Sequence, residues 1–98
     1  MAKPPYYRAR RPLKFYDPAQ VFADHVEQFH ARNDTWALGC CPFHDERRPS
    51  FSMNLESGWF RCNSTHCQTD GKNIVEFIME LHTLTFRQAL SYLEARYG

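Results

Sequence analysis

Two short cysteine- and histidine-containing motifs constrain the fold of this chain more than any other feature of its sequence. The first is Cys41-Pro-Phe-His44, the second is Cys62-Asn-Ser-Thr-His-Cys67, and 17 residues separate them. Structural zinc sites take four thiolate or imidazole ligands in a tetrahedron, and two closely spaced pairs on separate loops supply such a set. The sequence therefore predicts one structural Zn²⁺ bound by Cys41, His44, Cys62 and Cys67.

Each motif also contains a second candidate ligand. Cys40 precedes Cys41, and His66 precedes Cys67. Adjacent residues of an extended chain point to opposite sides, so we expect one residue of each neighbouring pair to reach the metal. The spacing to His44 favours Cys41 over Cys40. The common Cys3His ligand class favours Cys67, although His66 is sterically compatible. Four reduced or disulfide-paired cysteines without metal are the alternative.

The length and hydropathy of the chain indicate a single small domain away from membranes. Its 98 residues suffice for one modest core, which a metal would help to stabilise. The sequence has no run of about 18 apolar residues, as a membrane helix needs, and no apolar stretch at its start, as a signal peptide needs. We therefore expect a cytoplasmic protein without a membrane partner, in which cysteines bind metal rather than form disulfides.

Charge is unevenly distributed along the chain. Residues 1–16 contain five Lys or Arg and no acid, whereas the remainder contains seven bases and eleven acids. We expect residues 1–16 to form a basic, flexible N-terminal arm and residues 17–98 to form one domain. In the N-terminal arm, the side chains of Arg8, Arg10 and Arg11 are candidates for sequence-independent phosphate contacts. The alternative is a tail that only increases solubility.

The pattern of apolar residues predicts an α+β fold. A short apolar segment at 36–40 and the alternating segment 50–55 indicate strands, and Glu56-Ser57-Gly58 leads into a returning strand at 59–62. In that strand, Phe60 and Cys62 should face one side, and Trp59 and Arg61 the other.

Three helices are predicted around this sheet. Asp17-Pro18 is a helix start with Gln20 as a capping partner, and Phe22, His25, Val26 and Phe29 would share a helical face. Asn73 and Thr85 are the caps of two further helices, with Glu76 and Gln88 three residues later. We assign the apolar stripes of these two helices to the core. In the helix capped by Asn73 the stripe is Ile74, Phe77, Ile78 and Leu81. In the helix capped by Thr85 it is Phe86, Ala89, Leu90, Leu93 and Tyr97.

Three segments of the sequence resemble the N-terminal zinc-binding domain of bacterial DnaG-type DNA primases. They are the run from Gly39 to Phe51 (GCCPFHDERRPSF), then Trp59-Phe-Arg-Cys62 followed by Cys67, Gly71 and the segment IVEFIM from Ile74 to Met79, and the tail LTFRQALSYL from Leu84 to Leu93. The resemblance covers about residues 17–97 and places the family's zinc ligands on Cys41, His44, Cys62 and Cys67. It implies a small zinc-ribbon-like antiparallel sheet with flanking helices. It also implies binding of single-stranded DNA template for primer synthesis, beside a primase polymerase domain or a replicative helicase.

The chain departs from the family pattern at three points. Its second motif is C-x4-C, whereas the family usually has C-x2-C, and the spacing from Gly71 to Phe77 is one residue longer than usual. The family's catalytic domain, with its Mg²⁺-binding acids, also has no counterpart in this sequence. Since Glu76, Glu80 and Glu94 fall at solvated helix positions, we expect no polymerase activity from this chain alone.

We expect nucleic acid to bind the sheet face opposite the zinc. Trp59 offers a stacking surface and Arg61 a cation, with Ser50, Ser52 and Asn54 beside them, and Arg47 and Arg48 extend the basic surface. The alternatives are that Trp59 packs under the first helix and that the two arginines are simply exposed. A zinc module that recruits a helicase or polymerase without touching DNA is the competing function. A metal- or thiol-dependent enzyme is the weakest reading, because four protein ligands leave no open metal position.

Overall fold

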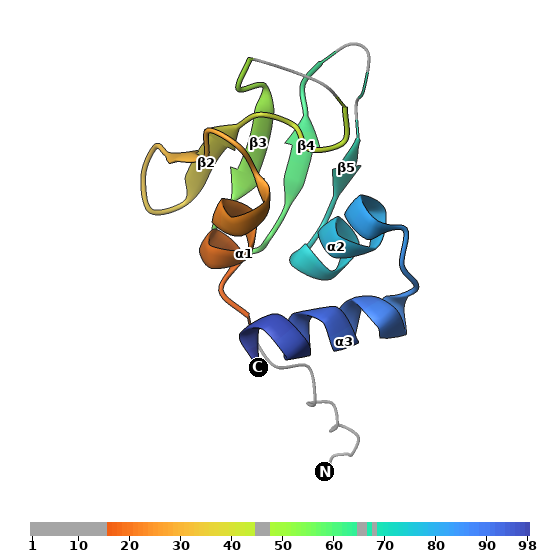
Figure 1. The fold of residues 1–98 in the computed structure, drawn as a ribbon. Helices are drawn as coiled ribbons and strands as arrows, with labels where there is room; N and C mark the ends of the chain where they lie inside the picture. Colours follow the sequence, from red (N-terminus) through yellow and green to blue (C-terminus); the bar gives the residue numbers. More distant parts are fainter. Residues whose placement is uncertain (1–15, 45–47, 65–66, 68) are drawn as a thin grey trace.

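The structure is a computed structural model that describes residues 16–44, 48–64, 67 and 69–98. It confirms an α+β domain, with three helices and one antiparallel sheet of order β1-β2-β3-β4-β5, so each strand pairs with the next along the chain (Figure 1). No helix in the described part of the chain has the length and apolar character needed to span a bilayer. The helices are α1 (Pro18–His25), α2 (Ile74–His82) and α3 (Phe86–Tyr97), and the strands are β1 (His30–Ala31), β2 (Trp36–Gly39), β3 (Phe51–Asn54), β4 (Phe60–Cys62) and β5 (Asp70–Gly71).

The predicted hairpin is formed by β3 and β4, and its turn is held by the Asn54 side chain. The Asn54 Oδ1 accepts hydrogen bonds from the backbone N–H groups of Glu56 and Ser57, both at 2.9 Å. Gly58 then adopts φ 87°, and a Cβ added there would lie 2.8 Å from the Ile74 nitrogen. The turn therefore needs glycine both for its backbone angle and for the close approach of α2.

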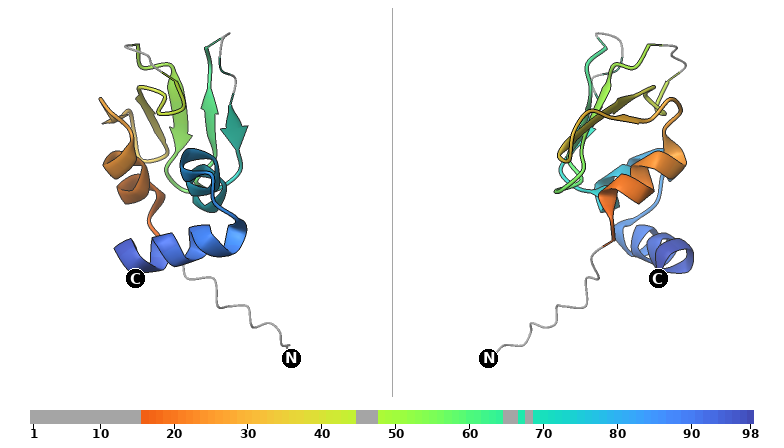
Figure 2. Two further views of the ribbon diagram at one scale, coloured as in Figure 1. Left: turned by 45° about the vertical axis from the view of Figure 1, so that its right-hand side comes forward. Right: turned by 90° about the vertical axis from the view of Figure 1, so that its left-hand side faces the viewer.

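The two faces of the sheet differ in burial, as the alternating pattern predicts. Ala37, Met53 and Phe60 lie side by side on β2, β3 and β4, and all three are fully buried. On the opposite face, Ser52 lies between Leu38 and Arg61, and Arg61 is exposed. Helices α1 and α2 cover the buried face, and α3 runs across the end of both (Figures 1 and 2).

Aromatic rings form the centre of the core. Phe22 of α1 and Phe77 of α2 meet edge to face at 4.9 Å between ring centroids, and Phe60 of β4 meets Phe77 at 5.3 Å. Such pairs add about 0.5–1.5 kcal/mol each beyond the burial of their area. The ring of Phe60 lies so close to Gly71 that a Cβ there would come within 2.4 Å of it. The aromatic core therefore requires a glycine at position 71 on the neighbouring strand.

The helix caps agree in part with the sequence. The side chains of Asp17 and Asn73 accept hydrogen bonds from backbone N–H groups at the starts of α1 and α2. In the predicted capping box, Glu76 would accept a hydrogen bond from the Asn73 backbone N–H. Glu76 Oε1 instead accepts from the backbone N–H of Lys72, one residue earlier, at 2.9 Å. Thr85 and Gln88 form the complete predicted capping box of α3.

The first helix is shorter than predicted. It ends at His25, and Val26 has extended backbone angles and a buried side chain. Gln28 has φ 57°, so the chain turns away before Phe29, and the predicted helical face does not extend to that residue. The segment that follows forms β1, and the segment before α2 forms β5, two strands that the sequence pattern did not predict.

Side-chain hydrogen bonds hold the beginning of the described chain against the last helix. The Tyr16 hydroxyl donates to Glu94 Oε1 at 2.8 Å. The Tyr97 hydroxyl donates to Asp24 Oδ2, also at 2.8 Å. Residue 16, α1 and the end of α3 therefore lie together at one end of the domain.

Candidate metal centre and sheet surface

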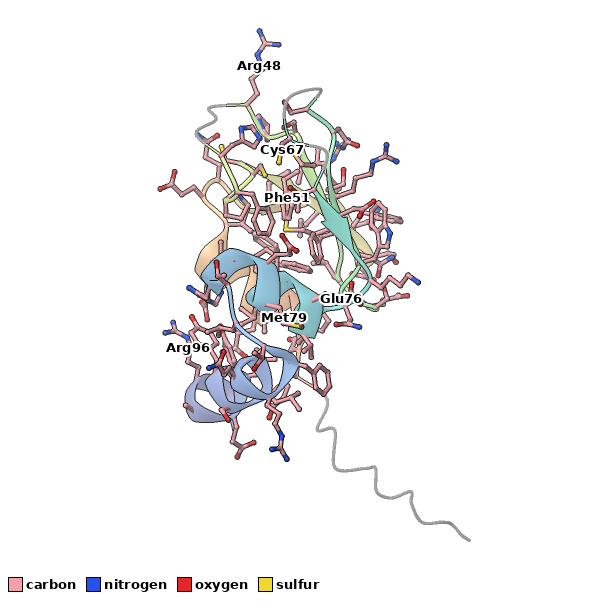
Figure 3. The ribbon with its side chains drawn as sticks, turned by 90° about the vertical axis from the view of Figure 1, so that its right-hand side faces the viewer. Arg48, Phe51, Cys67, Glu76, Met79 and Arg96 are labelled. Atoms are coloured by element: carbon pink, nitrogen blue, oxygen red, sulfur yellow. The ribbon has the colours of Figure 1, made fainter. Side chains whose placement is uncertain are left out.

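The structure brings the four predicted zinc ligands together. Cys41 and His44 follow β2, Cys62 is the last residue of β4, and Cys67 lies between β4 and β5. One ligand atom from each residue lies within 4.8 Å of the others. Figure 3 shows Cys67 at the end of the domain opposite α3, whose residue Arg96 is labelled there. Residues from the β2–β3 connection, the end of β4 and the β4–β5 connection therefore converge on a single point.

The distances within this cluster fit a tetrahedral Zn²⁺. With Zn–S bonds of about 2.3 Å, two thiolates on a tetrahedron lie about 3.8 Å apart, and a thiolate and an imidazole nitrogen about 3.5 Å apart. The Cys41 and Cys67 sulfurs are 3.8 Å apart, and His44 Nε2 is 3.3 Å from the Cys62 sulfur. The donor set also has the Cys3His composition of structural zinc sites. The residues present therefore suit one Zn²⁺.

The protein environment acts differently on two of the thiols. Burial raises the pKa of Cys41, and the hydrogen bond from the Phe43 backbone N–H, at 3.4 Å, offsets only part of this. Burial also acts to raise the pKa of Cys67, but hydrogen bonds with Thr69, whose Oγ1 is 3.1 Å from the sulfur, and with the Cys41 and Cys62 thiols together outweigh it and lower the pKa. Because zinc binds thiolates, loading the site must release the Cys41 proton.

The structure also bears on the alternative ligands. Among the described residues, the cluster contains Cys41 and not its buried neighbour Cys40. The Cys40 backbone N–H donates to the Glu27 carbonyl at 2.9 Å, which ties this residue to the turn after α1. His66 lies outside the described residues. All four cysteines are free of disulfides.

The predicted nucleic-acid residues of the sheet lie on the face opposite Cys62. Arg61 is exposed, and its register partners on the two neighbouring strands are Ser52 and Asp70. Trp59 precedes β4 and is half-buried. Ser50 lies just outside β3, where its carbonyl accepts hydrogen bonds from the backbone and side chain of Asn63. Asn54 is committed to the hairpin turn.

Trp36 is a surface residue that the sequence pattern does not distinguish from the rest of its strand. Its side chain is 42% exposed, and its ring meets that of Trp59 edge to face at 5.7 Å. Neither tryptophan is among the described side chains that form the core or pack against it. The register explains the pair, since Trp36 lies opposite Asn54, whose N–H donates to the Trp59 carbonyl. A shallow hollow of about 310 Å³ adjoins Trp36 and is lined by Arg32, Asn33, Trp36, Ala37, Leu38 and Ser52.

The other predicted cationic residues lie away from this pair or outside the described chain. Arg48 is exposed and projects from the metal-bearing end of the domain (Figure 3). Arg47, Arg8, Arg10 and Arg11 lie outside the described residues. Their contacts with nucleic acid therefore stay predictions.

Comparison with known proteins identifies relatives over most of the chain. Residues 14–98 match the CHC2 zinc finger of DnaG-type proteins. The DNA primase of Streptomyces coelicolor is 40% identical over 60 residues, which cover 61% of this chain and 9% of that protein. The DNA primase of Helicobacter pylori strain 26695 is 33% identical over 88 residues, which cover 90% of this chain and 15% of that protein. This chain thus spans a small fraction of the length of the curated relatives it matches.

The match and the geometry lead to the same assignment. The matched region contains all four residues of the Cys-His-Cys-Cys cluster, and the cluster has the dimensions of a zinc site. The resemblance noted in the sequence is confirmed, and the chain belongs to the CHC2 zinc-finger family of DnaG-type DNA primases.

Proposed function

We propose that this chain is a zinc-stabilised module that binds single-stranded DNA template in support of primer synthesis. The observation that carries the proposal is the contact of the exposed Trp36 with the half-buried Trp59, on the sheet face that carries Arg61 and lies opposite the buried Cys62. Zinc at Cys41, His44, Cys62 and Cys67 would join the segment that leads into β3 to the segment that follows β4, at the end of the hairpin away from its turn. It would have a structural role, because four protein ligands complete its tetrahedron.

The sheet surface has the parts that single-strand binding needs. Unpaired bases stack on aromatic rings, and each such contact contributes about 1–3 kcal/mol. Trp36 presents such a ring, and its edge-on contact with Trp59 holds it in place. Arg61 offers a guanidinium for phosphate or for stacking on a base, and Arg32 borders the adjoining hollow.

The basic residues elsewhere would extend this surface. We propose that Arg47 and Arg48, and Arg8, Arg10 and Arg11 of the N-terminal arm at residues 1–16, contact phosphates without reading sequence. Residues 17–98 would be the folded module. Polymerisation would belong to a separate primase polymerase domain, with which the module would act in the cytoplasm, alone or beside a replicative helicase.

Fluorescence anisotropy with a labelled single-stranded oligonucleotide tests this proposal. Trp36→Ala and Trp59→Ala should each weaken binding by about 1–3 kcal/mol while the zinc content stays at one per chain. Arg61→Gln should reduce the slope of log affinity against log salt by about one, because one phosphate contact is lost. The matched control Arg87→Gln, at an exposed position of α3, should leave the slope unchanged.

Two outcomes would contradict the proposal. If the tryptophan variants bind the oligonucleotide as tightly as the parent chain, the sheet face is not the binding surface. If the zinc-loaded parent binds no oligonucleotide at any salt concentration, the competing function of recruiting a protein partner would be favoured.

A further inference from the structure

A second hollow lies on the helical side of the domain, away from the tryptophan pair. It has a volume of about 430 Å³, and α2 forms much of its wall, with Phe86 at the start of α3. Figure 3 shows Glu76 and Met79 of α2 close together at this side of the domain. The described residues that line it include three acids and no base, and they are Asp70, Asn73, Val75, Glu76, Met79, Glu80 and Phe86.

The walls of this acidic groove combine apolar surface with negative charge. Phe86 is 50% exposed, so the prediction that it belongs to the core stripe of its helix was wrong, and it is one of two large hydrophobic side chains exposed in the described chain. Val75 and Met79 are half-buried and continue the apolar surface along α2. Glu80 is exposed, and the half-buried Glu76 accepts a hydrogen bond from the Lys72 backbone N–H at 2.9 Å. Such a groove suits a cationic segment that also carries aromatic or aliphatic side chains.

The chain itself contains a segment with this composition. Residues 1–15 carry the bases Lys3, Arg8, Arg10, Arg11 and Lys14 and no acid. The same segment contains Tyr6, Tyr7, Leu13 and Phe15. Its charge is opposite to that of the groove, and its aromatic rings match the apolar wall.

The point of attachment allows the segment to reach the groove. Tyr16, the first described residue, is hydrogen-bonded to Glu94 of α3. From Glu94 back to Phe86 the helix advances about 12 Å, at about 1.5 Å per residue. Fifteen residues of extended chain span up to about 50 Å. The groove is therefore well within reach along the surface of α3.

We propose that residues 1–15 bind within the same molecule to the acidic groove of α2 and the start of α3. Arginine side chains would pair with Glu76 and Glu80, and an aromatic side chain would cover Phe86 and Met79. Exposed ion pairs are individually weak and are screened by salt, so the contact depends on the high effective concentration that the covalent link provides. The bound and released states would then both be populated at moderate salt.

This contact would regulate the basic arm. The arginines that occupy the groove are those proposed above to contact phosphates, so nucleic acid and the acidic groove would compete for them. Only this consequence rests on the proposed function, because binding in the groove does not require DNA.

Nuclear magnetic resonance of the full zinc-loaded chain, with ¹³C-methyl methionine, tests the contact directly. The Met79 methyl resonance should shift when Arg8, Arg10 and Arg11 are all changed to Gln. Glu80→Lys and addition of about 0.5 M NaCl should shift it in the same direction, because both remove the electrostatic attraction. The matched control Glu27→Lys, at an exposed position after α1, should leave it unchanged. Identical Met79 resonances in the parent and the triple arm variant would overturn the proposal.

Oligonucleotide affinity provides a second readout. If about two thirds of the molecules hold the arm in the groove, Glu80→Lys should bind single-stranded DNA about threefold more tightly than Glu27→Lys, which has the same net charge. Equal affinities of these two variants, together with an unchanged Met79 resonance, would refute both the contact and its competition with DNA. If no variant binds DNA but the Met79 shifts occur, the proposed function fails and the intramolecular contact stands.

Discussion

Cys62 belongs both to the candidate zinc site and to the hydrophobic core. Its side chain is fully buried among the core residues, and its sulfur lies 3.3 Å from His44 Nε2. Cys41 is a member of the same core cluster, and Cys67 packs against it. The metal ligands are therefore not confined to a surface loop, and their geometry depends on the packing of β4.

Exchange of single cysteines separates the metal role from the packing role. Cys62→Ser should lower bound zinc from one equivalent to a small fraction, because the tetrahedral set loses a thiolate. Cys40→Ser should keep one equivalent, since Cys40 is also buried but lies outside the cluster. Metal analysis of the purified variants measures both. Loss of zinc in Cys40→Ser would mean that Cys40 acts as a ligand.

At the residue scale the sequence predicted the metal site better than the sheet surface. The spacing of Cys41, His44, Cys62 and Cys67 reflects local chain geometry, which a linear pattern retains. The contact of Trp36 with Trp59 depends on the register of β2 on β3, with Asn54 between them. Alternation within each strand indicates which side chains are buried, but it leaves open registers that differ by two residues, so the sequence pattern does not indicate the contact of Trp36.

The elements that were predicted correctly have strong local signals. The hairpin of β3 and β4 follows from alternation and a glycine turn, and the start of α3 follows from its capping box. Strands β1 and β5 have two residues each, too few for any period to be visible. Helix α1 ends earlier than predicted because Val26 is buried with an extended backbone and Gln28 has a left-handed backbone conformation. Tertiary packing determines both, so the local sequence does not indicate them.

The capping box of α3 gives a test at the scale of one element. Thr85 Oγ1 accepts from the Gln88 N–H at 3.2 Å, and Gln88 Oε1 accepts from the Thr85 N–H at 2.9 Å. Thr85→Ala should lower the free energy of unfolding by about 1 kcal/mol. Ser91→Ala, at an exposed position within α3, should leave it unchanged or raise it slightly, because alanine favours helix. Urea unfolding of zinc-loaded protein measures both, and equal effects would argue against the capping box.

For the whole molecule, metal removal tests whether the fold depends on zinc. The core is small and shares two cysteines with the cluster, so we expect zinc binding to contribute directly to folding. Excess chelator should abolish the cooperative unfolding transition seen by circular dichroism, and added zinc should restore it. An unchanged thermal transition in metal-free protein would contradict the structural role.

The interface of the three helices should make stability depend on pH. Burial, followed by the nearby His25 and Arg96, lowers the pKa of His82. The folded state then binds this proton less readily than the unfolded chain, whose histidine pKa is about 6.5. The contribution of neutral His82 to the free energy of unfolding is therefore present above a pH of about 6.5 and is lost as the pH falls below that value.

Comparison of the parent with His82→Gln isolates this effect. Zinc release at acid pH destabilises both proteins, so it cancels in the difference between them. The parent should lose more free energy of unfolding than His82→Gln between pH 7.5 and 5.5 in urea titrations. Parallel pH profiles would show that His82 does not contribute.

The hydrogen bonds from Tyr16 to Glu94 and from Tyr97 to Asp24 have a mechanical consequence. They bring the entry and the exit of the folded chain to the same pole, while the cysteine cluster occupies the far pole (Figure 3). Any polypeptide joined before Tyr16 or after α3 would hold the domain at the pole opposite the cysteine cluster. The metal-bearing tip would then stay clear of the attachment, and a pull on both junctions would load α3 and α1 before it reached the sheet.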